Sequence, residues 1–453
     1  MGRGVESRFE RYAQKMVEAL GHADRVTPAQ WYLRGLMLPG TRKSVEPMAA
    51  RVHPQNVRSA HQAMHHLVAE APWSDAALLA TVAREVLPAL RQARAAPCYW
   101  IIDDTGFRKW GKHSVGVARQ YCGQLGKTDN CRVAVSLSFA TADGSLPLAY
   151  RLYLPREWTD DRARCAHAGV PDAVAFATKG ELAWEQIAAA LASGIPRGPV
   201  LMDAAYGQEA ALRDRLSAYG LTYAVGVRSD TAVWWGPHQP APMPPAPSKG
   251  HARIRVVRDA THQPLSVREL AHHLPAANYR TLTWCEGTNS PLRSRFARVR
   301  VCAAHADRIR AEEWLLIEWP KGESEPTGSF LSTLPAAVSF SALVNVTKMR
   351  WRIERDYLEL KQELGLGDYE GRNWRGFHHH ASLCIAAYGF LMLERLSGAK
   401  KNSARLQAPA VPEAFRPRGA RTDATPHSVV DRQRPLPTGS RARQKASAVP
   451  VLR

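Results

Sequence analysis

The chain has 453 residues, 45% of them hydrophobic, and its 61 Lys and Arg outnumber its 41 Asp and Glu, for a formal charge of +20. This length allows two or three domains with packed cores, and no apolar run reaches the ~18 residues of a membrane span. Met1–Glu6 lacks a signal-peptide pattern and the Ser or Thr needed for myristoylation. Seven scattered cysteines without a CxxC pair indicate reduced thiols, so we expect a cytoplasmic protein. The positive charge predicts a polyanionic partner, most often nucleic acid.

Residues 1–95 carry helical spacing throughout. We expect helices over residues 9–20, 28–38, 44–52, 55–69 and 75–93. Arg42 and Lys43 lie among them. The region is either a DNA-binding helical module that uses these two cations, or a helical cap packed on the next domain with Arg and Lys in solvent.

The pattern changes to strands near Pro97. The apolar segment 98–102 ends in Asp103 and Asp104, and residues 132–141 and 146–154 form two further strands, joined as an antiparallel hairpin beside the first. A helix over 179–192, a buried strand ending in Asp203, a helix over 208–219 and a strand over 222–227 follow. The order βββ-α-β-α-β predicts an α/β fold, a ribonuclease-H-like mixed sheet with helices on both faces, whose first part spans residues 96–229.

Three segments complete the chain. Residues 230–335 include a Pro-rich stretch at 237–249 and strand-like runs at 295–301, 313–319 and 329–334, so we expect a β-rich insertion. Residues 336–398 return to helices, the last over 377–396 and opened by three consecutive His, which point in different directions and therefore do not predict a shared metal site. Residues 399–453 hold 12 Lys and Arg against 3 Asp and Glu, which predicts a disordered basic tail.

The segment 348–364 has no Pro or Gly and predicts one amphipathic helix. Its apolar stripe consists of Ile353, Tyr357, Leu360 and Leu364, and along one edge lie Arg350, Glu354 and Lys361. The acids Asp356, Glu359 and Glu363 project from the side opposite that cluster. Taken alone, the cluster is either a partly exposed ion pair or part of an active site.

Asp104, Asp203 and Glu354 can meet only through the fold, and three carboxylates suit Mg²⁺, with Mn²⁺ as a substitute. Two such ions activate a water or a 3′-hydroxyl and stabilise the leaving oxygen. Arg350 and Lys361 would then neutralise phosphates of bound DNA. Asp103 remains an alternative to Asp104, because adjacent strand residues point to opposite faces and both faces of this strand are apolar.

Six stretches carry a family resemblance: residues 42–50, 103–107 (Asp-Asp-Thr-Gly-Phe), 114–121, 203–207 (Asp-Ala-Ala-Tyr-Gly), 350–357 and 369–380. They resemble insertion-sequence transposases of the DDE superfamily, in the group related to IS4 and most like the IS701 family. These proteins share a Tyr-x2-Arg-x3-Glu-x6-Lys signature whose Glu is the third catalytic acid. Here Arg350, Glu354 and Lys361 match it, and Thr347 replaces the Tyr. Related enzymes place the first Asp directly before a small residue, which favours Asp104 over Asp103.

The resemblance implies a transposase that binds terminal inverted repeats, cleaves double-stranded DNA there with two Mg²⁺ ions, and joins the 3′ ends to target DNA. It also implies a homodimer in a synaptic complex, in a bacterial cytoplasm and associated with the nucleoid when bound to DNA. Two alternatives stay open. One is a ribonuclease-H-like nuclease without strand transfer, and the other is a DNA-binding protein whose catalytic centre has decayed.

Overall fold

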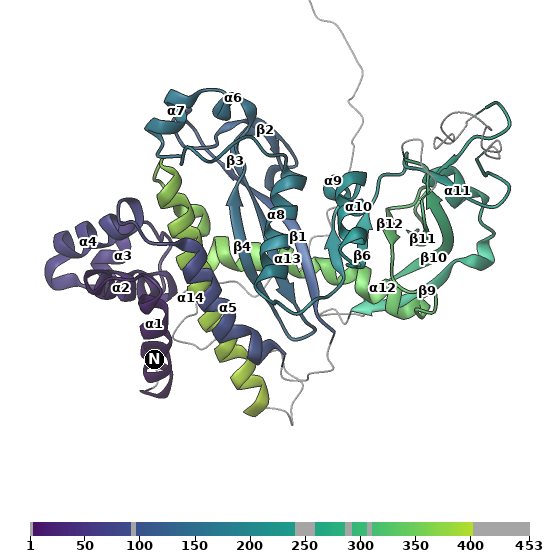
Figure 1. Ribbon diagram of the computed structural model, residues 1–453. Coiled ribbons are helices and arrows are strands. Elements are labelled where there is room, and N and C mark those ends of the chain that lie inside the picture. Colours follow the sequence, from purple (N-terminus) through teal and green to yellow (C-terminus); the bar gives the residue numbers. More distant parts are fainter. Residues whose placement is uncertain (1–2, 92–96, 241–258, 286–291, 306–309, 402–453) are drawn as a thin grey trace, which may run out of the picture. The chain divides into compact units, whose positions relative to one another are not determined.

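A single mixed sheet organises the chain. The computed structural model describes residues 3–91, 97–240, 259–285, 292–305 and 310–401. Within them, twelve strands form one sheet in the order β2-β3-β1-β5-β6-β12-β11-β10-β7-β8, with β4 paired to β3 and β9 paired to β10 (Figure 1). The Pro-rich stretch predicted at 237–249 lies mostly outside the described residues, as does the basic tail from residue 402 onward.

The strand order of the first part confirms the ribonuclease-H-like prediction. Its strands are β1 (Tyr99–Arg108), β3 (Lys127–Ala140), β4 (Ser145–Leu152), β5 (Val200–Met202) and β6 (Tyr223–Gly226). β3 pairs antiparallel with β1 and β4, whereas β5 pairs parallel with both β1 and β6. The resulting order β4-β3-β1-β5-β6, three antiparallel strands followed by two parallel ones, is that of the ribonuclease-H-like sheet. An edge strand, β2 (Ala118–Cys122), was not predicted.

Helices cover both faces of this sheet, which explains why β1 is apolar on both sides. α8 (Lys179–Ala192) packs on β3, and Gln186 donates a hydrogen bond of 3.1 Å to the carbonyl of Val135. On the other face, Tyr357 of α13 (Arg352–Leu358) shares a 2.8 Å hydrogen bond with Ser136. The remaining helices of this part are α6 (Arg156–Thr159), α7 (Arg162–His167), α9 (Ala204–Gly207) and α10 (Ala210–Ala218).

The N-terminal helices pack on the long helix α14 (Trp374–Lys401). They are α1 (Arg3–Glu18), α2 (Val26–Met37), α3 (Val45–Val52), α4 (Val57–Ala69) and α5 (Asp75–Leu90). The Tyr12 hydroxyl donates to the carbonyl of Ala386 at 2.8 Å, and the Tyr32 hydroxyl lies 2.8 Å from Nδ1 of His380. These contacts are what the helical-cap interpretation predicts. No helix in the described ranges combines the length and hydropathy of a membrane span.

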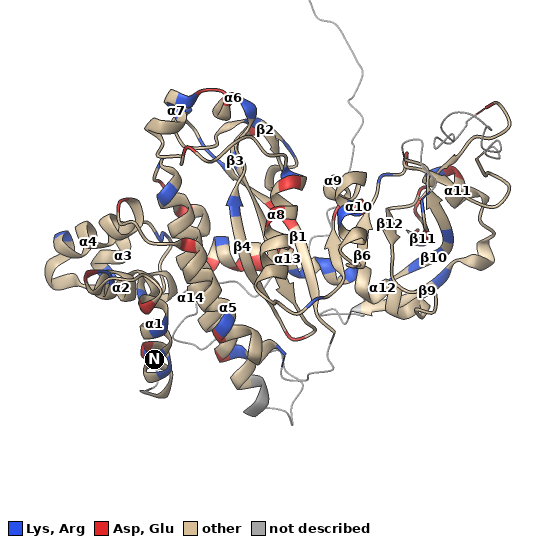
Figure 2. Cartoon of the chain, viewed as in Figure 1, with Lys and Arg blue, Asp and Glu red and all other residues tan. Residues whose placement is uncertain are grey.

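The β-rich segment continues the same sheet. It contains β7 (Ala232–Trp234), β8 (Leu265–Ser266), α11 (Val267–His273), β9 (Arg280–Cys285), β10 (Leu292–Ala303), β11 (Glu312–Glu318) and β12 (Gly328–Ser332). β12 pairs antiparallel with β6, with Leu331 opposite Val225. Arginines, drawn blue in Figure 2, recur along β10. The segment is therefore hydrogen-bonded to the first part of the sheet along a full strand.

The prediction of one regular helix over residues 348–364 is wrong. The chain runs through α12 (Phe340–Lys348), a 3₁₀ turn (Met349–Trp351), α13 and a π-helical turn (Glu359–Glu363). A π turn holds more residues than an α turn, so side chains after it no longer follow the 100° spacing. The predicted apolar stripe is nevertheless buried, with Leu360 and Leu364 at most 1% exposed.

Candidate active site

Three acids from distant parts of the sequence come near one another: Asp103 in the middle of β1, Asp203 directly after β5, and Glu354 on α13. β1 continues to Arg108, so the prediction that this strand ends in Asp103 and Asp104 is wrong. The two strands are parallel, with Trp100 opposite Val200 and Ile101 opposite Leu201. Continuing that register puts Asp103 level with Asp203, which directly follows β5. Glu354 lies in the first turn of α13.

Arg350 connects the first and third acids. Its Nη1 lies 2.8 Å from Oδ2 of Asp103, and its Nη2 lies 3.0 Å from Oε1 of Glu354. The Asp103 side chain is 14% exposed and the Glu354 side chain 66%, so the pair runs from the interior to the surface. The backbone N–H of Asp104 donates to Oδ1 of Asp103 at 2.8 Å. One guanidinium therefore holds two carboxylates that would otherwise repel each other.

The surroundings of the Asp103 carboxyl disfavour its ionised form. Burial raises its pKa to about 7; Arg350 opposes the shift, and the nearby charges of Asp203 and Asp104 add to it. Burial lowers the pKa of Arg350, but the charges of Asp103, Glu354, Asp203 and Tyr357 together outweigh burial, and the net shift is upward. Asp103, Asp203 and Glu354 therefore all act on the Arg350 guanidinium, and Asp203 also acts on Asp103.

Asp104 faces the opposite side of β1. Its Oδ2 accepts hydrogen bonds from Nζ of Lys179 at 2.8 Å and from the Tyr206 hydroxyl at 3.2 Å. Lys179 is the first residue of α8, whose start is fixed by a capping box between Thr178 and Glu181. Asp104 as the catalytic acid stays a prediction. The geometry favours its alternate, Asp103, because only the Asp103 carboxylate contacts Arg350.

Asp203 caps a four-residue helix. Its Oδ1 accepts from the backbone N–H groups of Ala205 at 2.9 Å and Tyr206 at 3.3 Å, at the N-terminus of α9. α9 lies directly against β6: a Cβ on Gly207 would come within 1.9 Å of the Gly226 carbonyl oxygen. The motif at 203–207 therefore encodes a carboxylate on a turn that is pressed against the neighbouring strand.

Lys361 makes its contacts away from Glu354. Its Nζ donates to the carbonyl of Gly106 at 2.8 Å and to Oε1 of Gln124 at 2.9 Å, and burial lowers its pKa to about 8. The π turn that contains Lys361 accounts for the departure from the predicted shared edge. Thr347 is buried, and its hydroxyl donates to the carbonyl of Leu343 at 2.8 Å. A DNA contact by Lys361 stays a prediction.

The other two cations predicted to bind DNA differ from each other. Lys43 is 5% exposed, its ammonium donates to the carbonyls of Leu36 at 2.8 Å and Leu38, and burial lowers its pKa to about 8. These contacts hold the Lys43 ammonium at the end of α2, and a DNA contact by Lys43 stays a prediction. Arg42 is exposed and pairs with Glu370 beside a cavity of about 610 Å³. Its contact with DNA stays a prediction.

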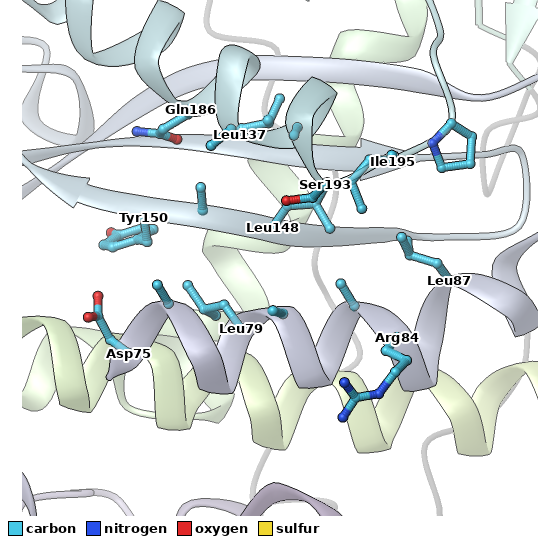
Figure 3. A pocket seen from close by; sticks show the side chains of 18 of the residues that line it. Asp75, Leu79, Arg84, Leu87, Leu137, Leu148, Tyr150, Gln186, Ser193 and Ile195 are labelled. Carbon is cyan, nitrogen blue, oxygen red and sulfur yellow. The ribbon is translucent and has the colours of Figure 1, made fainter. Parts of the chain in front are cut away.

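A further cavity lies elsewhere. It measures about 1320 Å³ and is lined by α5, β3, β4 and α8, with Leu79 and Leu87 facing Leu137 and Leu148 across it (Figure 3). The acids Asp103, Asp203 and Glu354 do not line it. Within the described ranges, no group of three or more His, Cys, Asp or Glu is arranged so that it could hold a metal ion.

Lys179 and Tyr206 were not predicted as site residues. Lys179 begins a helix that was predicted, and Tyr206 belongs to a motif that was noted, so both positions were visible. Their convergence on Asp104, 75 and 102 residues away, depends on the strand order and on where each helix begins.

Comparisons with known proteins show which family the chain resembles. The sequence profile described as DDE superfamily endonuclease matches residues 15–291, a stretch that includes Asp103, Asp104 and Asp203 and ends before Glu354. A protein of Microchaete diplosiphon described as "Probable transposase for insertion sequence element IS701" is 33% identical over 179 residues. That alignment covers 39% of this chain and 43% of the relative, so the matched part spans less than half of the relative's length.

Among solved structures, a cryo-EM structure of a piggyBac transposase synaptic complex with hairpin DNA overlaps 87% of this chain and 69% of its own chain. The TM-score is 0.41 and the identity 11%, too low to match individual residues. The profile match, in contrast, covers more than half of the chain and includes both β1 and β5. The chain belongs to the DDE superfamily endonucleases.

Proposed function

We propose that this chain is the transposase of an insertion sequence: it binds the terminal inverted repeats, cleaves DNA there in a metal-dependent reaction, and transfers the freed 3′ ends to target DNA. The observation that carries the proposal is the Arg350 bridge between Asp103 and Glu354, with Asp203 near enough to raise the pKa of Asp103. The middle of β1, the residue after β5 and the start of α13 thus supply an Asp, an Asp and a Glu, in the chain order expected for a DDE centre.

We assign Asp103, Asp203 and Glu354 as the residues that would hold the metal ions. All donor atoms are carboxylate oxygens, which suit Mg²⁺ and also Mn²⁺. The raised pKa of Asp103 fits such a site, because a cation relieves the repulsion among clustered carboxylates. When bound, the ions would supply activation of a water or 3′-hydroxyl and stabilisation of the leaving oxygen. Arg350 already neutralises two of the acids, so metal binding requires this side chain to release at least one of them.

The partner we propose is double-stranded DNA, at the element's ends and at the target, bound by a homodimer in a synaptic complex in the cytoplasm. The formal charge of +20 supports a polyanionic partner. So does the name of the relative that matches 39% of the chain, a probable transposase for an insertion sequence element. Arg350, once free of an acid, is placed to contact a phosphate beside the reacting carboxylates.

The test compares matched variants on one DNA substrate. Duplexes carrying the chromosomal sequences that flank the gene are incubated with the full chain and Mg²⁺, and cleavage and end-joining are measured separately. Asp103→Asn, Asp203→Asn and Glu354→Gln should each abolish cleavage while leaving DNA binding in a gel-shift assay intact. Glu363→Gln is the matched control, because Glu363 is an exposed acid on the same helical segment.

Each outcome separates one interpretation from the others. Cleavage without joined products would indicate a nuclease that lacks strand transfer. DNA binding by the wild type with no cleavage in Mg²⁺ or Mn²⁺ would indicate a decayed centre. Full cleavage by any one of the three variants removes that residue from the site.

A further inference from the structure

We propose that Asp104 is a positioning residue: through the Tyr206 hydroxyl it fixes the α9 turn and thereby orients the Asp203 carboxylate toward Asp103. This inference rests on the proposed function, because it concerns how one acid of the proposed site is held. It gives the second aspartate of the Asp103-Asp104 pair a role distinct from metal binding.

The connection is a continuous chain of hydrogen bonds. Oδ2 of Asp104 accepts from the Tyr206 hydroxyl at 3.2 Å. The backbone N–H of the same tyrosine donates to Oδ1 of Asp203 at 3.3 Å, next to the 2.9 Å bond from Ala205. The Tyr206 side chain thus ties the α9 turn to β1, and the Tyr206 backbone holds the carboxylate that caps this turn. A displacement of the tyrosine ring acts directly on the N–H that binds Asp203.

The contacts that Oδ2 of Asp104 already makes argue against this oxygen as a metal ligand. A carboxylate oxygen has two lone pairs, and on Oδ2 these are engaged by the Lys179 ammonium at 2.8 Å and by the Tyr206 hydroxyl. The Asp104 side chain is 17% exposed and the Lys179 side chain 30%, so this ion pair is only partly open to solvent. Lys179 pairs with the same oxygen that accepts the tyrosine hydroxyl, so the ion pair and the hydrogen bond fix Oδ2 of Asp104 together.

The α9 turn requires such support because it has four residues and cannot be rigid on its own. On one side it is pressed against β6, where Gly207 leaves no room for a Cβ beside the Gly226 carbonyl. On the other side, Tyr206 is 1% exposed and reaches Asp104. The two contacts hold the turn between β1 and β6, with Asp203 at its start.

Two substitutions isolate the connection. Tyr206→Phe removes only the hydroxyl, and Asp104→Asn keeps an acceptor oxygen while removing the charge that pairs with Lys179. Partners that orient a metal ligand typically contribute ~10–100-fold to metal affinity or activity, so we expect a loss in that range for each variant. Because both act on one connection, the double variant should lose no more than the worse single variant, which is the non-additivity of a shared network.

The experiment measures Mn²⁺ binding as well as cleavage. Free Mn²⁺ is followed by electron paramagnetic resonance as the full chain is titrated, and single-turnover cleavage is measured on the same preparations. Tyr206→Phe should weaken Mn²⁺ binding within the stated range without abolishing it. Tyr219→Phe is the control for loss of a tyrosine hydroxyl, because Tyr219 is 57% exposed at the end of α10. Thermal melting of each variant confirms that it is folded, and Asp104→Glu provides a second acceptor if Asp104→Asn fails to fold.

Three results decide the matter. If Tyr206→Phe binds Mn²⁺ and cleaves as the wild type does, the connection does not operate and the inference is overturned. The inference also fails if Asp104→Asn abolishes Mn²⁺ binding as fully as Asp103→Asn, since Asp104 would then be a ligand. Unchanged Mn²⁺ binding by Asp103→Asn and Glu354→Gln is a different result: it would refute the proposed metal site itself.

Discussion

Asp103→Asn should stabilise the protein at neutral pH while removing its activity. The pKa of Asp103 rises from an ordinary 3.8 to about 7, chiefly through burial, and that value already includes the opposing attraction of Arg350. Three pKa units correspond to about 4 kcal/mol, since one unit is ~1.4 kcal/mol. The sign follows from linkage: between pH 3.8 and about 7 the folded state binds more protons than the unfolded state, so this group lowers stability as pH rises.

The assay is denaturant unfolding in EDTA from pH 4 to pH 9, for wild type, Asp103→Asn and the exposed control Glu363→Gln. The gain of Asp103→Asn over wild type should be smallest at pH 4, grow by up to ~1.4 kcal/mol per pH unit, and level off above pH 7. The pairing of ionised Asp103 with Arg350 is already contained in the pKa of about 7, so its loss on substitution needs no separate allowance. A difference between the two proteins that stays constant over this whole range would refute the reasoning.

Three further predictions concern the surroundings of the site. Gly207→Ala should cost ~1–3 kcal/mol of stability and reduce cleavage, because its Cβ would meet the Gly226 carbonyl oxygen; Gly367→Ala, with open space around it, should show neither effect in melting and cleavage assays. His380→Gln should flatten the loss of stability on acidification from pH 6.5 to about 4, because burial lowers the pKa of His380 to about 4 and only the unfolded chain takes up the proton; a slope unchanged in pH-dependent melting would contradict this. Arg350→Lys should recover only part of the cleavage lost in Arg350→Ala, since one ammonium cannot bridge both acids in the fixed geometry of a guanidinium; full recovery would assign Arg350 a role as a point charge.

The sequence was informative where periodicity and strand ends carry the information. The strand order of the first part and the start of α8 at Lys179 followed from apolar runs and turn residues. The choice between Asp103 and Asp104 did not, because β1 is apolar on both faces and only the helices packed on each face distinguish the two acids. The position of Lys361 was mispredicted for a different reason. The prediction assumed a constant angle between successive residues, and the π turn changes that angle locally.

The β-rich segment also differed from its expected form. Its strands were predicted to form an insertion, and along the chain they do lie between β6 and α12. The pairing of β12 with β6, however, was not signalled by the sequence. This pairing joins strands about 100 residues apart, with Val225 opposite Leu331. It depends on the register between β6 and β12, which the local pattern of apolar and polar residues does not determine.

That pairing has a mechanical consequence. Val225 of β6 is paired with Met202 of β5 on one side and with Leu331 of β12 on the other, and Asp203 is the residue after Met202. Adjacent strands lie ~4.8 Å apart, so a main-chain path of about 10 Å leads from β12 to the strand that ends in the second acid. A hinge between β6 and β12 would have to break this ladder. A force on β10, along which the arginines recur, is therefore transmitted as shear through the backbone hydrogen bonds of the sheet to the turn that begins with Asp203. A tilt of β10 displaces this turn.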